Sequence, residues 1–233
     1  MILLSRCGSA AAVRVGDGGS VEKEEKKQKM NDAISCTSLT VWRKSLLFTC
    51  DGFTVIDSTG NLIYRVDNYR GDRTDNIILM DAYGKPLFTL RRKKRRFVDK
   101  WLIFEGEAED GKEMSSKKPM YWVRKHVNLK LQRNNHQNHQ DVVVAQVFDT
   151  TPPPEKEKEK GNPIFVIQGS YERRSCQVVD GLSRTEVVAE IKRKDASIKG
   201  ISFGLDVFLL IVRSGLDPAF AMSLVLLLDQ MFT

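Results

Sequence analysis

The stretch GLDPAFAMSLVLLLDQM, residues 215–231, decides the fold of this 233-residue chain. Asp217 suits the N-cap of a helix, and Pro218 suits the first helical position, where its missing N–H costs nothing. From there until Asp229 only Ser223 interrupts the apolar residues. A helix that is apolar on every face must be enclosed by protein or by lipid.

The length of the apolar segments favours protein over lipid. A membrane-spanning helix needs about 20 mostly apolar residues. Polar and helix-breaking residues around Gly215 divide the region into two shorter pieces, Val207–Val212 and Ala219–Leu228. Neither piece can cross a bilayer alone, so we expect no transmembrane span. The first piece is short and rich in Val, Ile, Leu and Phe, which is typical of a buried strand.

The sequence before the helix predicts twelve short strands separated by turn signals. In VVAEIKR, residues 187–193, Ala189 and Ile191 face one side while Glu190 and Lys192 face the other, so one face is dry and one is wet. Asp57–Gly60 and Asp81–Gly84 both fit type I turns, and such turns connect antiparallel neighbours. The predicted strands are LTVWRKS, FTVID, LIYRVDNY, NIILMDA, PLFTLRR, WLIFEGE, MYWVRKHV, VVVAQVF, PIFVIQGS, SCQVVDG, VVAEIKR and FGLDVFLLIVR.

Strands with one dry face, followed by a helix that is dry all round, predict a closed twelve-stranded antiparallel β-barrel wrapped around a central hydrophobic C-terminal helix. The helix would be ~20 Å long, close to the ~17–20 Å of a typical strand. We expect the barrel domain over residues 37–233 and a disordered N-terminal extension over residues 1–36, whose charged and small residues bury little. Every recognisable feature follows Met30, so Met1 and Met30 both stay open as the start.

The composition indicates an intracellular protein with an anionic partner. The formal net charge is +7, which favours phospholipid headgroups or nucleic acid. The four cysteines are isolated, as expected of reduced thiols. The N-terminus has too short an apolar run for a secretory signal, although an organelle transit peptide is an alternative. We expect a monomer in the cytoplasm, peripheral at the plasma membrane, in the nucleus, or both.

Several blocks in order resemble the plant LURP-one-related family, which belongs to the tubby C-terminal-like superfamily together with the phospholipid scramblases. The blocks include ILMDAYGKPLFTLRRKK, YERRSCQVVD and FGLDVFLLIVRSGLDPAFAMSLVLLLDQM, and the resemblance covers about residues 36–232. It implies a twelve-stranded barrel threaded by the C-terminal helix. It also implies a role in plant defence and, through the tubby proteins, binding to phosphoinositides.

The strongest candidate site is a run of six cations at the end of a predicted strand. Such a cluster can bind phosphatidylserine or PIP₂ at about 1 kcal/mol per cation. A second basic patch follows a later strand, and its lysines are expected to help the first. The residues of the two patches are Arg91, Arg92, Lys93, Lys94, Arg95, Arg96, Lys192, Arg193 and Lys194.

Three other interpretations of the cation run stay open. It could direct nuclear import, contact nucleic acid in a transcription-associated factor, or form a solvated strand end with no partner. Lipid translocation is disfavoured, because the sequence lacks the acidic calcium-binding segment and the Cys-rich stretch of calcium-activated scramblases.

The sequence predicts neither an enzyme nor a metal protein. It contains no nucleophile elbow, P-loop or dinucleotide fingerprint, so we expect no cofactor. His136 and His139 form an H-x-x-H pair in an Asn- and Gln-rich loop without further ligands, which disfavours zinc. His126 would share a strand face with Trp122 as an ordinary packed or surface histidine.

Overall fold

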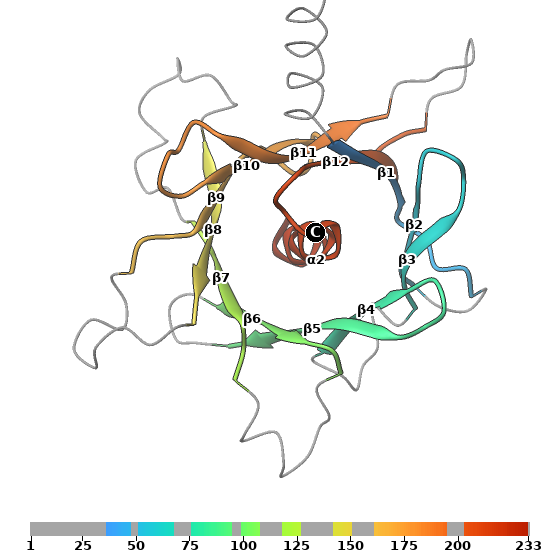
Figure 1. The fold of residues 1–233 in the computed structure, drawn as a ribbon, viewed down its shortest axis with the longest axis horizontal. Helices are drawn as coiled ribbons and strands as arrows, with labels where there is room; N and C mark the ends of the chain where they lie inside the picture. The colour runs from blue at the N-terminus through green and yellow to red at the C-terminus, as the bar shows by residue number, and fades with distance from the viewer. Residues whose placement is uncertain are drawn as a thin grey trace, which may run out of the picture. The chain divides into compact units, whose positions relative to one another are not determined.

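The computed structural model describes residues 36–47, 51–67, 76–94, 99–107, 118–126, 142–150, 161–194 and 203–232. Within these ranges twelve strands form one closed antiparallel barrel (Figure 1). Each strand pairs with the next in the chain, and β12 returns to pair with β1. The strands are β1 (Cys36–Trp42), β2 (Phe53–Ile56), β3 (Leu62–Val66), β4 (Asn76–Asp81), β5 (Pro86–Lys93), β6 (Lys100–Glu105), β7 (Tyr121–Lys125), β8 (Val143–Asp149), β9 (Phe165–Ser170), β10 (Ser175–Asp180), β11 (Val187–Arg193) and β12 (Val207–Arg213). The predicted fold class is confirmed.

The local chemistry of strands and turns follows the predicted pattern. In β11, Ala189 and Ile191 are buried in the barrel core, whereas Lys192 is exposed. The turn that begins at Asp57 is closed by a hydrogen bond from the Gly60 N–H to the Asp57 carbonyl. The Asp57 carboxylate also accepts hydrogen bonds from Thr59 and from Asn61, and these bonds lower its pKa to about 2.

Among the strand boundaries that differ from the prediction, two lie at the closing seam of the barrel, where pairing overrides local composition. β1 begins at Cys36, earlier than the predicted run, since it pairs with β12 along the whole strand from Cys36 opposite Arg213 to Trp42 opposite Val207. β12 itself begins at Val207, and the preceding residues from Phe203 form a turn. A long partner strand therefore draws the polar start of β1 into the sheet.

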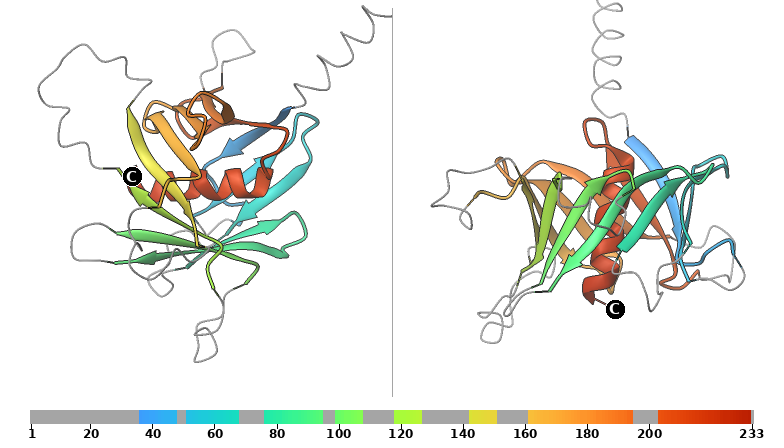
Figure 2. Two further views of the ribbon diagram at one scale, coloured as in Figure 1. Left: turned by 60° about the vertical axis from the view of Figure 1, so that its left-hand side comes forward. Right: turned by 90° about the horizontal axis from the view of Figure 1, so that it is seen from below.

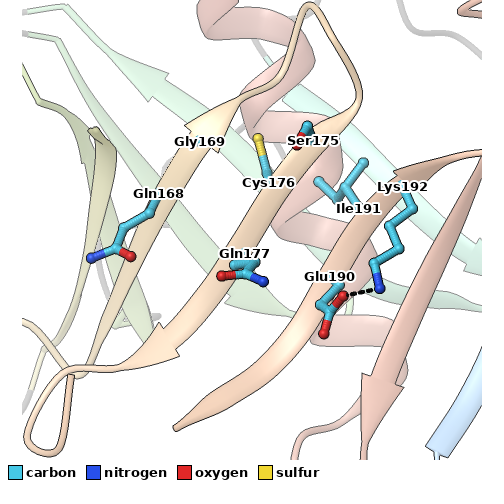
Figure 3. A pocket seen from close by; sticks show the side chains of 8 residues that line it. All are labelled: Gln168, Gly169, Ser175, Cys176, Gln177, Glu190, Ile191 and Lys192. Atoms are coloured by element: carbon cyan, nitrogen blue, oxygen red, sulfur yellow. Dashed lines mark ion pairs between the residues drawn. The ribbon is translucent and has the colours of Figure 1, made fainter. Parts of the chain in front are cut away.

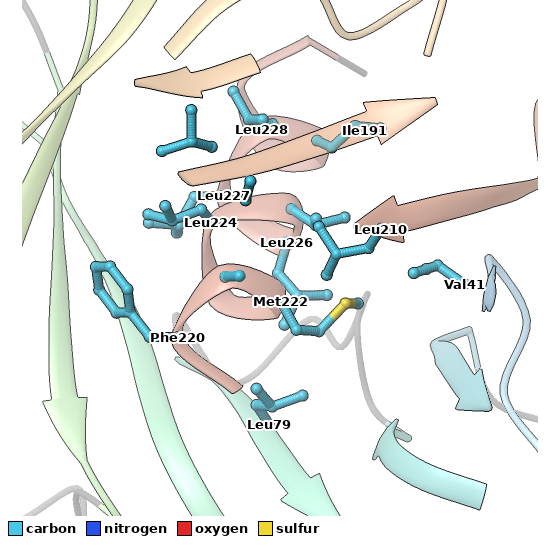
Figure 4. Close-up of a cluster of buried hydrophobic side chains, with 14 of the residues drawn as sticks. Val41, Leu79, Ile191, Leu210, Phe220, Met222, Leu224, Leu226, Leu227 and Leu228 are labelled. Atoms are coloured by element: carbon cyan, nitrogen blue, oxygen red, sulfur yellow. The ribbon is translucent and has the colours of Figure 1, made fainter. Parts of the chain in front are cut away.

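Helix α2 (Pro218–Phe232) runs through the barrel interior (Figure 2). Asp217 caps it as predicted, accepting a hydrogen bond from the Ala219 N–H at 3.0 Å. Every residue from Ala219 to Asp229 is buried, and the apolar ones pack against inward-facing strand residues on several sides (Figure 4). The Phe220 ring lies 4.6 Å from the ring of Tyr121, measured between centroids. No helix of the described residues is long and apolar enough to cross a membrane.

The single charged residue of the helix is held by a polar network. Asp229 is 1% exposed; its carboxylate lies 3.2 Å from the Arg43 guanidinium and accepts a hydrogen bond from the Tyr171 hydroxyl at 3.1 Å. Burial and the Asp229 charge raise the pKa of Tyr171 above its ordinary range. Lys125 donates to the Met231 carbonyl at 2.8 Å, which places a cation at the negative end of the helix dipole.

These contacts give the barrel two distinguishable rims. The residues that contact the end of α2 lie at the ends of odd-numbered strands. Arg43 follows β1, Lys125 is the last residue of β7, and Tyr171 follows β9, so these strands end where the helix ends. We call this the helix-end rim. The opposite rim, where the odd-numbered strands begin and the helix starts, is the helix-start rim (Figure 2, right).

We expect Leu224→Ala to lower the free energy of unfolding by about 3 kcal/mol, because it removes buried methyl groups and leaves a cavity inside a closed barrel. Leu224 is 1% exposed. Chemical denaturation at equilibrium measures the change, and Tyr83→Ala, at a side chain that is 97% exposed, is the control. Equal stability of the two variants would contradict the enclosed helix.

Candidate anion-binding site

The predicted cation run lies at the end of β5, on the helix-end rim. Arg91, Arg92 and Lys93 are the last residues of the strand, and Lys94 follows it. Arg95 and Arg96 lie outside the described residues. The run is therefore split by strand geometry, because successive side chains of a strand point to opposite faces.

Arg92 points towards the barrel mouth and is part of the fold. It lies two residues after the fully buried Leu90 and opposite Trp101 in the sheet register. Its guanidinium lies 5.7 Å from the Trp101 ring centroid, and its Nε donates to Asp99 at 2.8 Å. Changing Arg92 would disturb the end of the core, so it is a poor probe of binding.

Arg91 and Lys93 face outward, and further cations lie beside Lys93 on the neighbouring strands. The register places Lys93 opposite Lys100 of β6, and Lys100 opposite Arg124 of β7. We call Lys93, Lys100 and Arg124 the cationic row. Side chains directly opposite each other are about 5 Å apart at Cβ, and like charges in this position are destabilising. Such an arrangement is suited to an anion that the three cations can share.

Aromatic rings and polar groups orient the outer cations. The Lys100 ammonium lies 4.3 Å from the Trp122 ring centroid, and Trp122 stacks on Phe148 with centroids 4.0 Å apart. Arg124 lies over the Phe148 ring and donates to Gln146 at 2.8 Å. On the other flank, the Arg91 Nε donates to the Asn76 side-chain oxygen at 2.6 Å. Ring contacts and hydrogen bonds therefore hold these cations at the outer surface of the barrel.

The two rims differ in charge sign. The comparison covers described residues in the connections at each rim, in the three strand residues next to them and in α2. Cations predominate at the helix-end rim: Arg43, Lys44, Arg65, Arg91, Arg92, Lys93, Lys94, Lys100, Arg124, Lys125, Arg173, Arg174, Lys192, Arg193 and Lys194, against Asp51, Asp67, Asp99, Glu172, Asp206 and Asp229. Acids predominate at the helix-start rim: Asp57, Asp81, Glu105, Glu107, Asp149, Asp180, Glu186 and Asp217, against Lys85, Lys118, Arg184 and Arg213. Among the described residues, cations are therefore in excess at the helix-end rim and acids at the helix-start rim.

Comparison with known proteins identifies the family. The LURP-one-related family model matches residues 37–229. This chain belongs to the LURP-one-related family. Protein LURP-one-related 8 of Arabidopsis thaliana is 40% identical over 206 residues, covering 88% of this chain and 92% of that protein. Protein LURP-one-related 17 of the same plant is 46% identical over 200 residues, covering 85% of each.

A solved X-ray structure of a protein from Arabidopsis thaliana has the same fold. It aligns with a TM-score of 0.55 at 23% identity, covering 86% of this chain and 94% of that one. At this identity the likeness supports the barrel architecture alone.

The second predicted patch of this LURP-one-related barrel lies far from the first. Strands β6 to β10 separate β11 from β5 in one direction, and β12 with β1 to β4 separate them in the other. The two patches therefore lie on opposite sides of the same rim. Lys192 forms an ion pair with Glu190, and the Lys194 ammonium donates to the Thr40 hydroxyl at 2.9 Å.

A hollow of about 80 Å³ lies between β9, β10 and β11 (Figure 3). Sites for organic ligands usually have volumes of about 300–1,000 Å³, so this hollow has room for small solvent molecules only. Its lining residues are Gln168, Gly169, Ser175, Cys176, Gln177, Glu190, Ile191 and Lys192.

The histidines of the chain do not join the candidate site. His126 lies directly after β7, where its N–H donates to the Val144 carbonyl at 2.8 Å. His136 and His139 lie outside the described residues. Among the side chains that the structure places, no three of His, Cys, Asp or Glu come together as metal ligands.

We expect Lys93→Gln to raise the free energy of unfolding at low salt by a few tenths of a kcal/mol, because it relieves like-charge repulsion from Lys100. The gain should shrink as salt screens the row. Chemical denaturation at two salt concentrations measures it, with Lys85→Gln on the helix-start rim as the control. A loss of stability would mean that Lys93 has a structural partner.

We expect Cys176 to resist alkylation in the folded protein, because burial raises the pKa of its thiol to about 12 against the opposing influence of Arg174. Mass spectrometry of iodoacetamide-treated protein at pH 8 should find Cys36, which is exposed, modified and Cys176 unmodified until denaturant is added. Since the unfolded thiol ionises near pH 9, the unfolding free energy should fall above that pH, by at most about 1.4 kcal/mol per pH unit for this group. Cys176→Ala should flatten the fall between pH 9 and 10; an unchanged slope would contradict the raised pKa.

Proposed function

We propose that this protein is a non-catalytic binding module that attaches to phosphoinositide-containing membrane. The observation that carries the proposal is the cationic row, flanked by Arg91 and supported by Trp122. Three outward cations in one register oppose one another across neighbouring strands. A phosphorylated headgroup would bring negative charge to three side chains that carry the same positive sign.

The charge of the whole rim supports a surface as the partner. The cations around the helix end attract an anionic bilayer, while the acids of the helix-start rim are repelled by it. Each cation near such a surface contributes about 1 kcal/mol. The barrel would therefore lie with the helix-end rim towards the membrane. Lys192 and Lys194, on the opposite side of this rim, add to the attraction without belonging to the same headgroup site.

Nucleic acid is the alternative partner, in a nuclear interaction or transcription-associated factor. Specific or non-specific binding to a duplex usually neutralises about 6–10 phosphates along a groove or backbone. The cationic row with Arg91 offers a more compact set, which fits one multiply phosphorylated headgroup better. A role in plant defence or signalling, which the family resemblance implies, is compatible with either partner.

The structure of the site also argues for binding without chemistry. The barrel interior is occupied by α2, whose residues from Ala219 to Asp229 are buried. The side chains of the cationic row offer hydrogen-bond donors and positive charge, and the aromatic rings beside them hold these side chains in place. We therefore assign them to recognition of a headgroup.

Vesicle sedimentation tests the proposal with the full chain. We expect binding to phosphatidylcholine vesicles that contain PIP₂, weaker binding with phosphatidylserine instead, and little binding to phosphatidylcholine alone. Replacing Arg91, Lys93, Lys100 and Arg124 together by Gln should weaken binding to PIP₂ vesicles about 100-fold or more, because each cation contributes about 1 kcal/mol.

The chain offers a matched control that removes the same charge elsewhere. Lys85, Lys118, Arg184 and Arg213 lie at the helix-start rim, and changing all four to Gln should leave vesicle binding nearly unchanged. Equal weakening of both variants would mean that only net charge matters. Strong, salt-sensitive binding of wild type to duplex DNA, with none to vesicles, would favour the nuclear alternative.

A further inference from the structure

The helix-end rim carries a group of exposed apolar side chains that the cationic row does not explain. They come from the end of β1 with the connection that follows it, and from the segment before β12. The Arg43 N–H donates to the Asp206 carbonyl at 2.8 Å, which ties the two segments together. The apolar loop patch consists of Trp42, Leu46, Leu47, Phe203 and Leu205, each between 38% and 48% exposed.

The backbone around the leucines is held in place, so their exposure is built into the fold. Ser45 is buried, donates to the Asp67 carboxylate at 3.2 Å and accepts a hydrogen bond from the Leu47 N–H at 3.0 Å. The Thr54 hydroxyl donates to the Lys44 carbonyl at 2.7 Å. Because Ser45 turns inward and is anchored, the leucines that follow it are kept at the surface.

Other exposed large apolar residues in the described ranges are arranged differently. Tyr83, Met120 and Leu182 lie on three separate connections of the helix-start rim. Single exposed apolar residues are ordinary on protein surfaces and need no partner. Five exposed apolar side chains on two hydrogen-bonded segments of one rim do need a partner.

Cations border the apolar loop patch and indicate the chemistry of what covers it. The Lys44 ammonium lies 5.5 Å from the Trp42 ring centroid, and the Lys194 ammonium lies 5.7 Å from that of Phe203. Lysine is depleted at protein–protein interfaces. In contrast, Trp with neighbouring Lys is typical of the membrane interface, where rings and aliphatic chains enter the acyl boundary and ammonium groups meet phosphates.

We propose that the apolar loop patch inserts into the interfacial region of an anionic lipid bilayer. The proposal rests on the function inferred above for the identity of the partner, and it adds a second contact. The cationic row is on β5 to β7, whereas the patch is beside β1 and β12, across the same rim. A barrel standing on this rim brings both to one lipid surface.

Trp42 itself reports insertion. Its fluorescence in the full chain should be quenched by phosphatidylcholine brominated in its acyl chains, in vesicles that also contain PIP₂ and phosphatidylserine. Trp101 is 4% exposed, and Trp122 is covered on one side by Phe148, so both should be quenched less. Trp42→Phe should remove most of the quenching, measured at lipid concentrations at which sedimentation shows the variant bound.

A leucine variant tests the contribution to affinity. Leu46→Ser with Leu47→Ser should weaken vesicle binding about ten-fold, because the two half-exposed side chains together would lose roughly the transfer energy of one fully buried leucine. Tyr83→Ser with Leu182→Ser is the matched control, since these side chains are more exposed but lie on the other rim. The control should bind like wild type.

The outcomes separate this proposal from the proposed function. Weak binding by the cationic-row variant, with wild-type binding by the leucine variant, overturns insertion and retains the headgroup site. The reverse result supports insertion and overturns the headgroup site, and weakening of both variants supports both. Unquenched Trp42 on every vesicle overturns insertion, and is the result expected if a protein covers the patch.

Discussion

An apolar helix without a polar face requires apolar partners in every direction, and this requirement shapes the barrel. A two-layer packing would leave part of α2 in water, whereas a closed sheet surrounds it. Closure also removes the unpaired edges that an open sheet presents. The inward residues of the strands meet the helix, as Leu79, Ile191 and Leu210 do around Met222 and its neighbours. The helix and the inward side chains thereby fill the interior of the barrel.

The direction of the helix makes the two rims chemically different. Its start is capped by Asp217, an acid at the positive end of the helix dipole, and its end is met by Lys125 and by Arg43 with Asp229. Acids and cations on the surrounding connections follow the same division. The polarity that stabilises one buried helix therefore coincides with the polarity that would orient the barrel on a charged surface.

The fold could be predicted because its information is local and periodic. Strand alternation, Asp–Gly turns and the unbroken apolar helix are each readable within a few residues. The candidate site could be predicted only in part. Lys100 and Arg124 belong to strands far along the chain from Lys93, and only the register brings the three together. Alternation after the buried Leu90 was the available signal that Arg92 turns away from them. The apolar loop patch could not be predicted, because Trp42 lies within the predicted strand LTVWRKS and Leu46 directly follows it.

The interior of the barrel supplies its stability, whereas the outer surface carries groups that reduce stability. Like charges opposite each other and leucines held in water both reduce stability, each by an amount that is small beside the burial of a whole helix. Because the stabilising contacts are inside, the outer row and the rim can keep unfavourable groups together at little risk to folding. Concentrating such groups on one rim is costly for an isolated barrel and favourable for one that rests against anionic lipid. The proposal that the helix-end rim is a binding surface rests on this difference.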